Sequence, residues 1–538
     1  MLDWTPFWTD ETAIEKGGRY PLLFNRFHDH LEEYLIKSIV TVTDRLRYIS
    51  YCCWIIGDIE NTIKCKKYIE FEEAFRRRES ALAIGTILLN PETDMGNYTT
   101  YGRNTMRGTV EDLNKLYKTS VPTLPSNPLG AFGQYYKGTL QNWGLTYVSE
   151  DGLIYLTESG AELYKIMDNH YQNSHYYIKY KGHNEVPGQV LHDWADVNHY
   201  DNITDDNHQD ERNFYKQILF YLNTDEVSDR TRRRDTFVIY MEVMDELSKK
   251  GFQLDTQIFQ DYLRNILYDQ SYFNDEGIKH TFKVSHFLQE ARFVWMIYEI
   301  HVYYRWWIEE FFKAFLNLLR GSENGLSLEE VINNIEPDIF NEKIYSYLND
   351  AGDYLNMTFH EFEKVFSNYQ NLNNDLLLED IVSYDSFIGF SEISAGLIMI
   401  IVLLNNKTNL IKNDRRYIGI RTSYVADFWF KDIGDNIVIW RDKSVVDFLK
   451  IILKKIVIYQ HDKAMYEKMD LRRCWFTSSA DKYQWRSDST SIWRPAKHNI
   501  ICNFLYDMGV INVIEGVVTL SQEGKDLYLK LKDDYYEK

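Results

Sequence analysis

The sequence predicts a mainly α-helical protein of several domains, with one small β-containing module that occurs twice. The chain has 538 residues, which is too long for a single hydrophobic core. Apolar residues recur at helical spacing, as Leu31, Leu35 and Ile39 illustrate. Pairs of short β runs occur in two stretches that share the same order of elements.

The first of these stretches covers residues 130–168. A short helix over 135–142 ends at Trp143-Gly144, and two β runs follow on either side of a turn. Thr157 is a suitable N-cap for the closing helix. A short helix followed by a two-stranded wing and a closing helix is typical of the second half of a winged helix, and the sequence predicts one here.

The same pattern returns over residues 499–531. A helix ends at Met508-Gly509, two β runs follow, and Ser521 stands where Thr157 stands in the first stretch. The clearest shared piece is Leu-(Thr/Ser)-x-x-Gly-x-x-Leu-Tyr, at residues 156–164 and 520–528. Two such stretches predict two winged-helix modules in one chain.

Composition shifts and clusters of proline or glycine suggest the domain organisation. Six of the 14 histidines lie in or beside one stretch, interleaved with aspartates, and we interpret it as a polar linker with metal binding as the alternative. The predicted parts are a helical domain (1–125), the first winged helix (126–168), the His/Asp-rich linker (169–212), an aromatic-rich helical domain (213–320), a helical domain (321–420) and a C-terminal winged-helix domain (421–538).

The composition limits the compartment and the partners. A formal net charge of −20 opposes the approach to nucleic acid, so any such contact needs local basic patches. The longest apolar run, 395–404, has about half of the ~20 residues that a membrane-spanning helix needs. Residues 1–12 lack a signal-peptide pattern, and the five cysteines lack zinc-ligand spacing. We expect a cytoplasmic protein with no membrane contact, metal or cofactor.

The first basic cluster consists of Arg45 and Arg47, in the first turn of a predicted helix. The helix dipole does not favour cations there. Arginines in that position bind either an internal carboxylate or an external phosphate, and the sequence leaves both alternatives open. A second cluster opens another predicted helix, with a phosphate, an acidic partner or the neighbouring aspartates as its ligand. It consists of Arg230, Arg232, Arg233 and Arg234.

The third cluster alternates basic residues with tryptophans ahead of the second module. Such alternation suits a nucleic-acid surface, a partner-docking site or cation–π packing within the domain. Its members are Arg472, Arg473, Arg486, Arg494, Lys497 and His498. In the first module, Lys137 lies on the helix before the predicted wing, whereas residues 499–508 carry no lysine or arginine. That difference favours protein docking for the second module.

Parts of the N-terminal half resemble a known group of proteins. The resemblance rests on three motifs: Thr41-Val42-Thr43-x-Arg45-x-Arg47-Tyr48-x-Ser50-x-x-x-Trp54, Phe75-Arg76-Arg77-Arg78-Glu79 and Gly133-Gln134-Tyr135-Tyr136. Together they resemble uncharacterised bacterial proteins encoded in anti-phage defence islands. They also resemble accessory subunits of SMC-like ATPases in Lamassu- and Wadjet-type systems. The resemblance implies a role in defence and no catalytic residue.

We expect a non-catalytic adaptor that bridges an SMC-like ATPase, a nuclease effector and DNA. One alternative is a stand-alone winged-helix DNA-binding regulator. The other is a nuclease of the HEPN or metal-dependent class. A HEPN site needs an arginine followed closely by a histidine, but Arg292 and His301 are nine residues apart. No phosphate-binding loop, dinucleotide fingerprint or hydrolase motif occurs.

Overall fold

The computed structural model describes residues 21–39, 44–91, 106, 108, 110, 112–222, 231–273, 278–366, 388–412, 437, 439–468, 474–479, 481–489, 494 and 496–536. These residues are mainly helical with small antiparallel sheets, which confirms the predicted mainly α class. Two compact units divide the chain. Unit 1 comprises Met1–Leu31, Leu267–Asp269 and Phe293–Ala496; unit 2 comprises Glu32–Ile266, Gln270–Arg292 and Lys497–Lys538.

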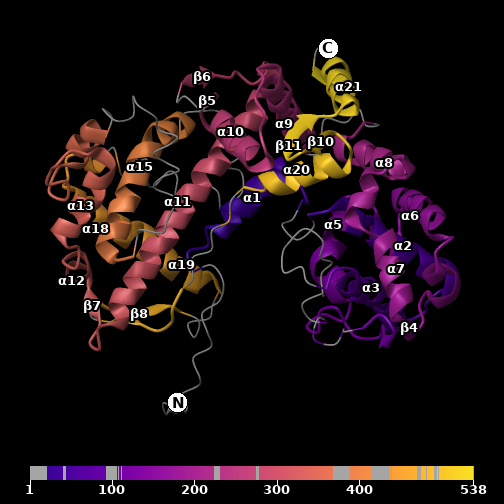
Figure 1. Cartoon of the computed structure of the whole chain (residues 1–538). Helices are drawn as coiled ribbons and strands as arrows, with labels where there is room; N and C mark the ends of the chain where they lie inside the picture. Colours follow the sequence, from indigo (N-terminus) through magenta and orange to yellow (C-terminus); the bar gives the residue numbers. More distant parts are fainter. Residues whose placement is uncertain are drawn as a thin grey trace, which may run out of the picture. The chain divides into compact units, whose positions relative to one another are not determined.

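The longest described helix, α11 (Gln289–Arg320), provides the core of unit 1 (Figure 1). Aromatic residues occupy most of its faces because other elements pack around it. Phe311 stacks on Phe390 of α15, with 5.2 Å between ring centroids, and Phe315 meets Phe476 of β8 at 5.5 Å. The other elements here are β7 (Leu326–Ser327), α12 (Leu328–Ile332), α13 (Pro337–Leu348), α15 (Phe390–Lys412), α18 (Val445–Ile452), α19 (Tyr459–Lys468), β8 (Phe476–Ser479) and β9 (Lys482–Trp485).

Unit 2 contains two similar halves. In the first half, α2 (Leu46–Thr62) is buried over most of its length and packs against α3, α6 and β3. The other elements of this half are α3 (Tyr68–Leu89), β1 (Leu116–Lys118), α5 (Lys137–Asn142), β2 (Thr146–Val148), β3 (Ile154–Leu156), α6 (Glu158–Tyr171), β4 (Glu185–Pro187), α7 (Gly188–Val197) and α8 (Gln209–Phe220).

In the second half, α9 (Thr231–Lys249) takes the place of α2. It packs against β11 and α21 just as α2 packs against β3 and α6, and the C-terminal elements lie beside it in Figure 1. The other elements are α10 (Thr256–Asp269), β5 (Ser271–Phe273), β6 (Lys279–Thr281), α20 (His498–Asp507), β10 (Ile511–Ile514), β11 (Val517–Leu520) and α21 (Gln522–Leu531). Helix α1 (Asn25–Leu35) precedes both halves in the chain.

The two halves are an internal repeat. The sequences before α2 and α9 correspond, because Val-(Thr/Ser)-Asp-Arg occupies residues 42–45 and 227–230. Helices α3 and α10 follow at matching places, with Phe71 and Phe259 buried at equivalent positions. In the second half, the main segment of unit 1 (293–496) separates α10 from α20 along the chain. Unit 1 is therefore largely an insertion into the second repeat.

The prediction of a polar linker over residues 169–212 is wrong. This stretch contains the end of α6, then β4, α7 and the start of α8, and α7 packs closely against α3. Trp194 of α7 is 1% exposed and stacks on Tyr176. The histidines and aspartates misled the prediction because they lie on the outer faces of these elements, while aromatic residues between them supply the core.

Candidate functional site: two equivalent modules and a buried arginine network

The two helix–hairpin–helix modules share the glycine that follows the first helix and the cap of the closing helix. Gly144 follows α5 with a φ of +74°, and Gly509 follows α20 with a φ of +68°. The N-cap hydroxyl of Thr157 donates to the Gly144 carbonyl at 2.5 Å, and that of Ser521 donates to the Gly509 carbonyl at 2.6 Å. The two caps also accept from the amides of Gly160 and Gly524. This common geometry confirms the predicted N-cap at Thr157 and gives Ser521 the same role.

Gly160 and Gly524 allow the closing helix to touch the hairpin. A Cβ atom at Gly160 would lie 2.0 Å from the Leu145 carbonyl oxygen, and one at Gly524 would lie 2.0 Å from that of Val510. Any side chain would push the helix away from the hairpin. The shared Leu-(Thr/Ser)-x-x-Gly motif thus encodes a cap and a close contact, which explains its presence in both modules.

Arg45 connects the first repeat to the second module. Its Nη2 lies 2.8 Å from Asp507 Oδ1 and 2.9 Å from Asp201 Oδ1. Asp507 also accepts from the Leu46 amide, so it binds the first turn of α2 through both groups. Burial raises the pKa of Asp507 to about 6, although Arg45 opposes that shift. Of the two alternatives for Arg45, the structure places internal carboxylates around it.

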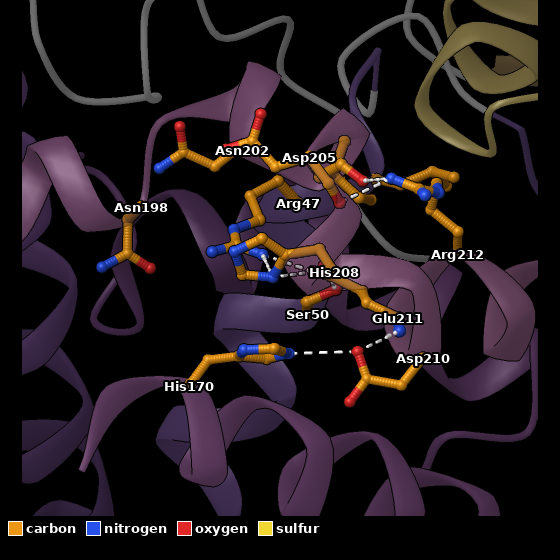
Figure 2. A network of polar contacts seen from close by, with 12 residues as sticks. Arg47, Ser50, His170, Asn198, Asn202, Asp205, His208, Asp210, Glu211 and Arg212 are labelled. Atoms are coloured by element: carbon orange, nitrogen blue, oxygen red, sulfur yellow. Dashed lines mark hydrogen bonds and ion pairs between the residues drawn. The ribbon is translucent and has the colours of Figure 1, made fainter. Parts of the chain in front are cut away.

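Arg47 lies at the centre of the polar network in Figure 2. It is 1% exposed, forms an ion pair with Glu211, and donates to the Val197 carbonyl at 3.0 Å. Glu211 in turn accepts from the Ser50 hydroxyl at 2.6 Å. Burial would raise the pKa of Glu211, but Arg47 and the hydrogen bonds outweigh burial and hold it below its ordinary value. The pair is a buried internal charge pair, in which only the Arg47 Nε lacks a hydrogen-bond partner.

Two histidines cover the outer side of this pair. The rings of His170 and His208 lie 4.1 Å apart between centroids, and His170 Nε2 lies 3.1 Å from Asp210 Oδ1 (Figure 2). His208 Nδ1 lies 3.1 Å from Arg47 Nη1 and accepts from it. Burial lowers the pKa of His208, with Arg47 adding to the effect. The cluster therefore favours a neutral His208 beside a charged arginine.

The described arginines of the second basic cluster also contact groups within unit 2. Arg232 is 25% exposed on its side chain and lies 2.6 Å from Glu290. Arg233 is 3% exposed, donates to the Lys37 carbonyl, and packs over the rings of Tyr221 and Trp143. Arg234 is 7% exposed, and Arg230 lies outside the described residues.

The third cluster separates into buried and exposed members. Lys497 Nζ lies 2.6 Å from Glu32 and donates to the Ile39 carbonyl, and His498 is hydrogen-bonded to Tyr240. Arg486 is exposed and donates to Thr477 at 3.2 Å. Arg494 and, in the first module, Lys137 are half-buried. Arg472 and Arg473 lie outside the described residues. A role of these clusters in binding a partner stays a prediction.

The exposed faces of both hairpins are apolar and acidic. Tyr147 is 51% exposed and stacks on Tyr155, while Val513 and Ile514 are 42% and 65% exposed. Neither 145–157 nor 510–521 contains a lysine or arginine. The first hairpin turn carries Glu150 and Asp151, and the second carries Glu515. Such surfaces repel phosphate and suit contact with a protein.

The described residues give no support to a metal centre. Among them, no group of three or more histidine, cysteine, aspartate or glutamate side chains could hold a metal ion. His301 is fully buried, its ring packs edge-on against Phe27, and burial holds its pKa well below the ordinary value. Within the part of the chain that the structure describes, no helix is long and apolar enough to cross a membrane.

No protein-family model matches this chain, and neither a curated protein nor a solved structure matches it. The sequence predicted the repeated helix–hairpin–helix module, but the longer internal repeat, which also contains α2 and α9, was missed. The second copy of Val-(Thr/Ser)-Asp-Arg, at residues 227–230, was its available signal. That signal marks α9 as the counterpart of α2 and explains why arginines cluster at both helix starts.

Proposed function

We propose that this chain is a non-catalytic adaptor subunit of a cytoplasmic anti-phage or anti-plasmid defence complex, in which two winged-helix modules dock on protein partners. The partners in this proposal are an SMC-like ATPase and a nuclease effector, with DNA bound through the complex. The defence context rests on the motif resemblance at residues 41–54, 75–79 and 133–136.

One observation supports protein docking above all others. Apart from Asn512 and Gly516, the exposed residues of both hairpins are apolar or acidic, and neither hairpin carries a lysine or arginine. A wing that binds DNA uses lysine or arginine to contact phosphates, and those contacts dominate affinity. The basic side chains at the starts of α2 and α9 are directed instead to internal carboxylates and carbonyls.

The test is co-purification of the tagged chain with the products of neighbouring genes, using variants of the hairpin surfaces. Tyr147→Glu combined with Ile514→Glu should abolish recovery of the partner. Ile258→Glu is the matched control, because Ile258 is 42% exposed on α10, outside both hairpins. Equal recovery with both variants would contradict docking through the hairpins. Salt-sensitive DNA binding by the isolated chain would favour the stand-alone regulator instead.

A further inference from the structure

The two repeats differ beside the second strand of each hairpin. In the second repeat, the segment between α9 and α10 folds back onto β11. The Leu254 carbonyl accepts from the Val518 amide at 2.8 Å, and the Leu254 side chain is 6% exposed. The chain itself thus supplies a short extended segment that covers the edge of β11.

The first repeat leaves the equivalent place open. Ile154 of β3 corresponds to Val518, because Leu156-Thr157 aligns with Leu520-Ser521 and both strands have the same register. A cavity of about 340 Å³ lies at this edge. It is lined by Ile59, Glu60, Asn61, Lys64, Cys65, Phe71, Leu153, Ile154 and Tyr155.

The difference follows from the linkers. Lys67 and Asp255 are the N-caps of α3 and α10, so Lys66 stands in sequence where Leu254 stands. Gly57 of α2 and Glu242 of α9 are equivalent, because Gly57 lies against Tyr164 and Glu242 is hydrogen-bonded to the matching Tyr528. Phe71 of α3 and Phe259 of α10 are equivalent as well. The chain takes 14 positions from 57 to 71 but 17 from 242 to 259, so the first linker is three residues shorter. A shorter linker with a lysine in place of the leucine does not reach the strand edge.

Three lysines lie in the short segment that borders the mouth of the cavity, within a strongly acidic protein. Lys64, Lys66 and Lys67 are all exposed, and Lys64 and Cys65 line the cavity itself. Three carboxylates lie near the cavity: Glu60 accepts from the Leu156 amide, Glu70 accepts from the Lys66 amide, and Asp151 interacts electrostatically with Tyr155. A ligand with acidic groups therefore complements this mouth.

We propose that this cavity binds an extended, acidic segment of a protein partner by adding it to the edge of β3. An aliphatic side chain of that segment would fill the cavity as Leu254 fills its counterpart. A main-chain carbonyl of the segment would accept from the Ile154 amide, and its acidic residues would face the three lysines. The proposal deepens the adaptor function, on which the identity of the ligand as a protein partner rests.

The probe is a synthetic heptapeptide with the sequence of residues 251–257, the segment that covers β11. The readout is the alkylation rate of Cys65 by a maleimide in full-length Cys474→Ser protein, because the other three cysteines are buried. Saturating peptide should slow alkylation at least fivefold. Replacing the peptide leucine with aspartate should abolish this protection, and replacing its last two residues with glutamate should increase the affinity several-fold.

Lys64→Glu combined with Lys66→Glu should weaken peptide binding at least fivefold in fluorescence polarisation, whereas Lys165→Glu, at an exposed site on α6, should not. Peptide binding without protection of Cys65, or with equal affinity in both variants, would overturn the proposal. Protection that rises with protein concentration in the absence of peptide would indicate a second copy as the occupant and would also overturn it.

These outcomes separate this inference from the adaptor function. Loss of the peptide effect with partner recovery intact removes only the cavity proposal. If the peptide protects Cys65 but the chain recovers no partner, the adaptor function is contradicted and the cavity remains a peptide-binding site.

Discussion

Arg45 and Asp507 form an ion pair across 462 positions of sequence, with 2.8 Å between Arg45 Nη2 and Asp507 Oδ1. The pair joins the N-terminal repeat to the end of α20 in the C-terminal one. Asp507 has no exposed side-chain surface. The pair therefore fixes α20, the first helix after the main segment of unit 1, to the start of α2 in the first repeat.

Removing one partner of this pair should destabilise unit 2. Arg45→Ala leaves Asp507 buried without its cation, and such losses cost about 3–5 kcal/mol. Urea denaturation followed by circular dichroism should show a lower midpoint. Arg77→Ala is the control, because Arg77 forms only a partly exposed i,i+4 pair with Glu73, and its loss should change stability by less than about 0.5 kcal/mol.

Glu79 should make stability depend on pH. Burial raises its pKa to about 7 from an ordinary value of 4.5, although the Phe132 amide and the Tyr48 hydroxyl donate to it. The folded state therefore holds this proton more tightly than the unfolded state. The resulting stabilisation is full below about pH 4.5 and is lost as pH rises through about 7, a change of about 3 kcal/mol.

The measurement compares urea midpoints at pH 5 and pH 7.5. Glu79→Gln should reduce the difference between the two midpoints, because the amide does not titrate. Glu73→Gln, at an exposed position of the same helix, should keep the wild-type difference. An unchanged difference in the Glu79 variant would show that other groups, such as Asp507, set the pH dependence.

The paired glycines predict equal effects in the two modules. Gly160→Ala and Gly524→Ala each bring a Cβ to 2.0 Å from a main-chain oxygen, so both should destabilise by several kcal/mol. Gly138→Ala is the matched control, because its Cβ meets nothing within 4 Å and alanine favours helix by about 1 kcal/mol. Thermal unfolding of the three variants provides the comparison, and a stabilised Gly524→Ala would contradict the equivalence.

Local patterns predicted the local structure well. Thr157 caps α6 as predicted, and both repeated stretches form a helix, two strands and a closing helix in the predicted order. These features depend on neighbours in the chain. The arginine clusters were harder to interpret because their partners are remote: Asp507, Glu211 and Glu290 lie 462, 164 and 58 positions away. Sequence spacing cannot distinguish a distant buried carboxylate from an external phosphate.

The arginines at the start of α9 should separate by burial. Arg233→Glu should unfold unit 2 or lower its stability strongly, because the guanidinium is 3% exposed among main-chain carbonyls and aromatic rings. Arg232→Glu should keep the fold, since its side chain is 25% exposed and Glu290 is 44% exposed. Circular dichroism shows whether each variant is folded. Because only Arg232→Glu should be folded, a binding assay on this cluster can be interpreted only for that variant.

The Arg47–Glu211 pair allows a test of whether this buried charge pair is needed for the fold. Arg47→Met alone should cost about 3–5 kcal/mol, because Glu211 then remains ionised and buried. Arg47→Met with Glu211→Leu should recover most of that loss, since the apolar side chains leave no buried charge and only the Ser50 hydroxyl, the His208 ring and the Val197 carbonyl lose a partner.

A double-mutant cycle in urea gives the coupling energy of the pair. Arg77→Met with Glu73→Leu is the matched exposed pair on α3, and it should show coupling below about 0.5 kcal/mol. If the Arg47 double variant folds and still recovers the partner, the network in Figure 2 is structural. If it folds but loses the partner, then Arg47 or its histidine neighbours take part in docking, and the binding surface extends beyond the hairpins.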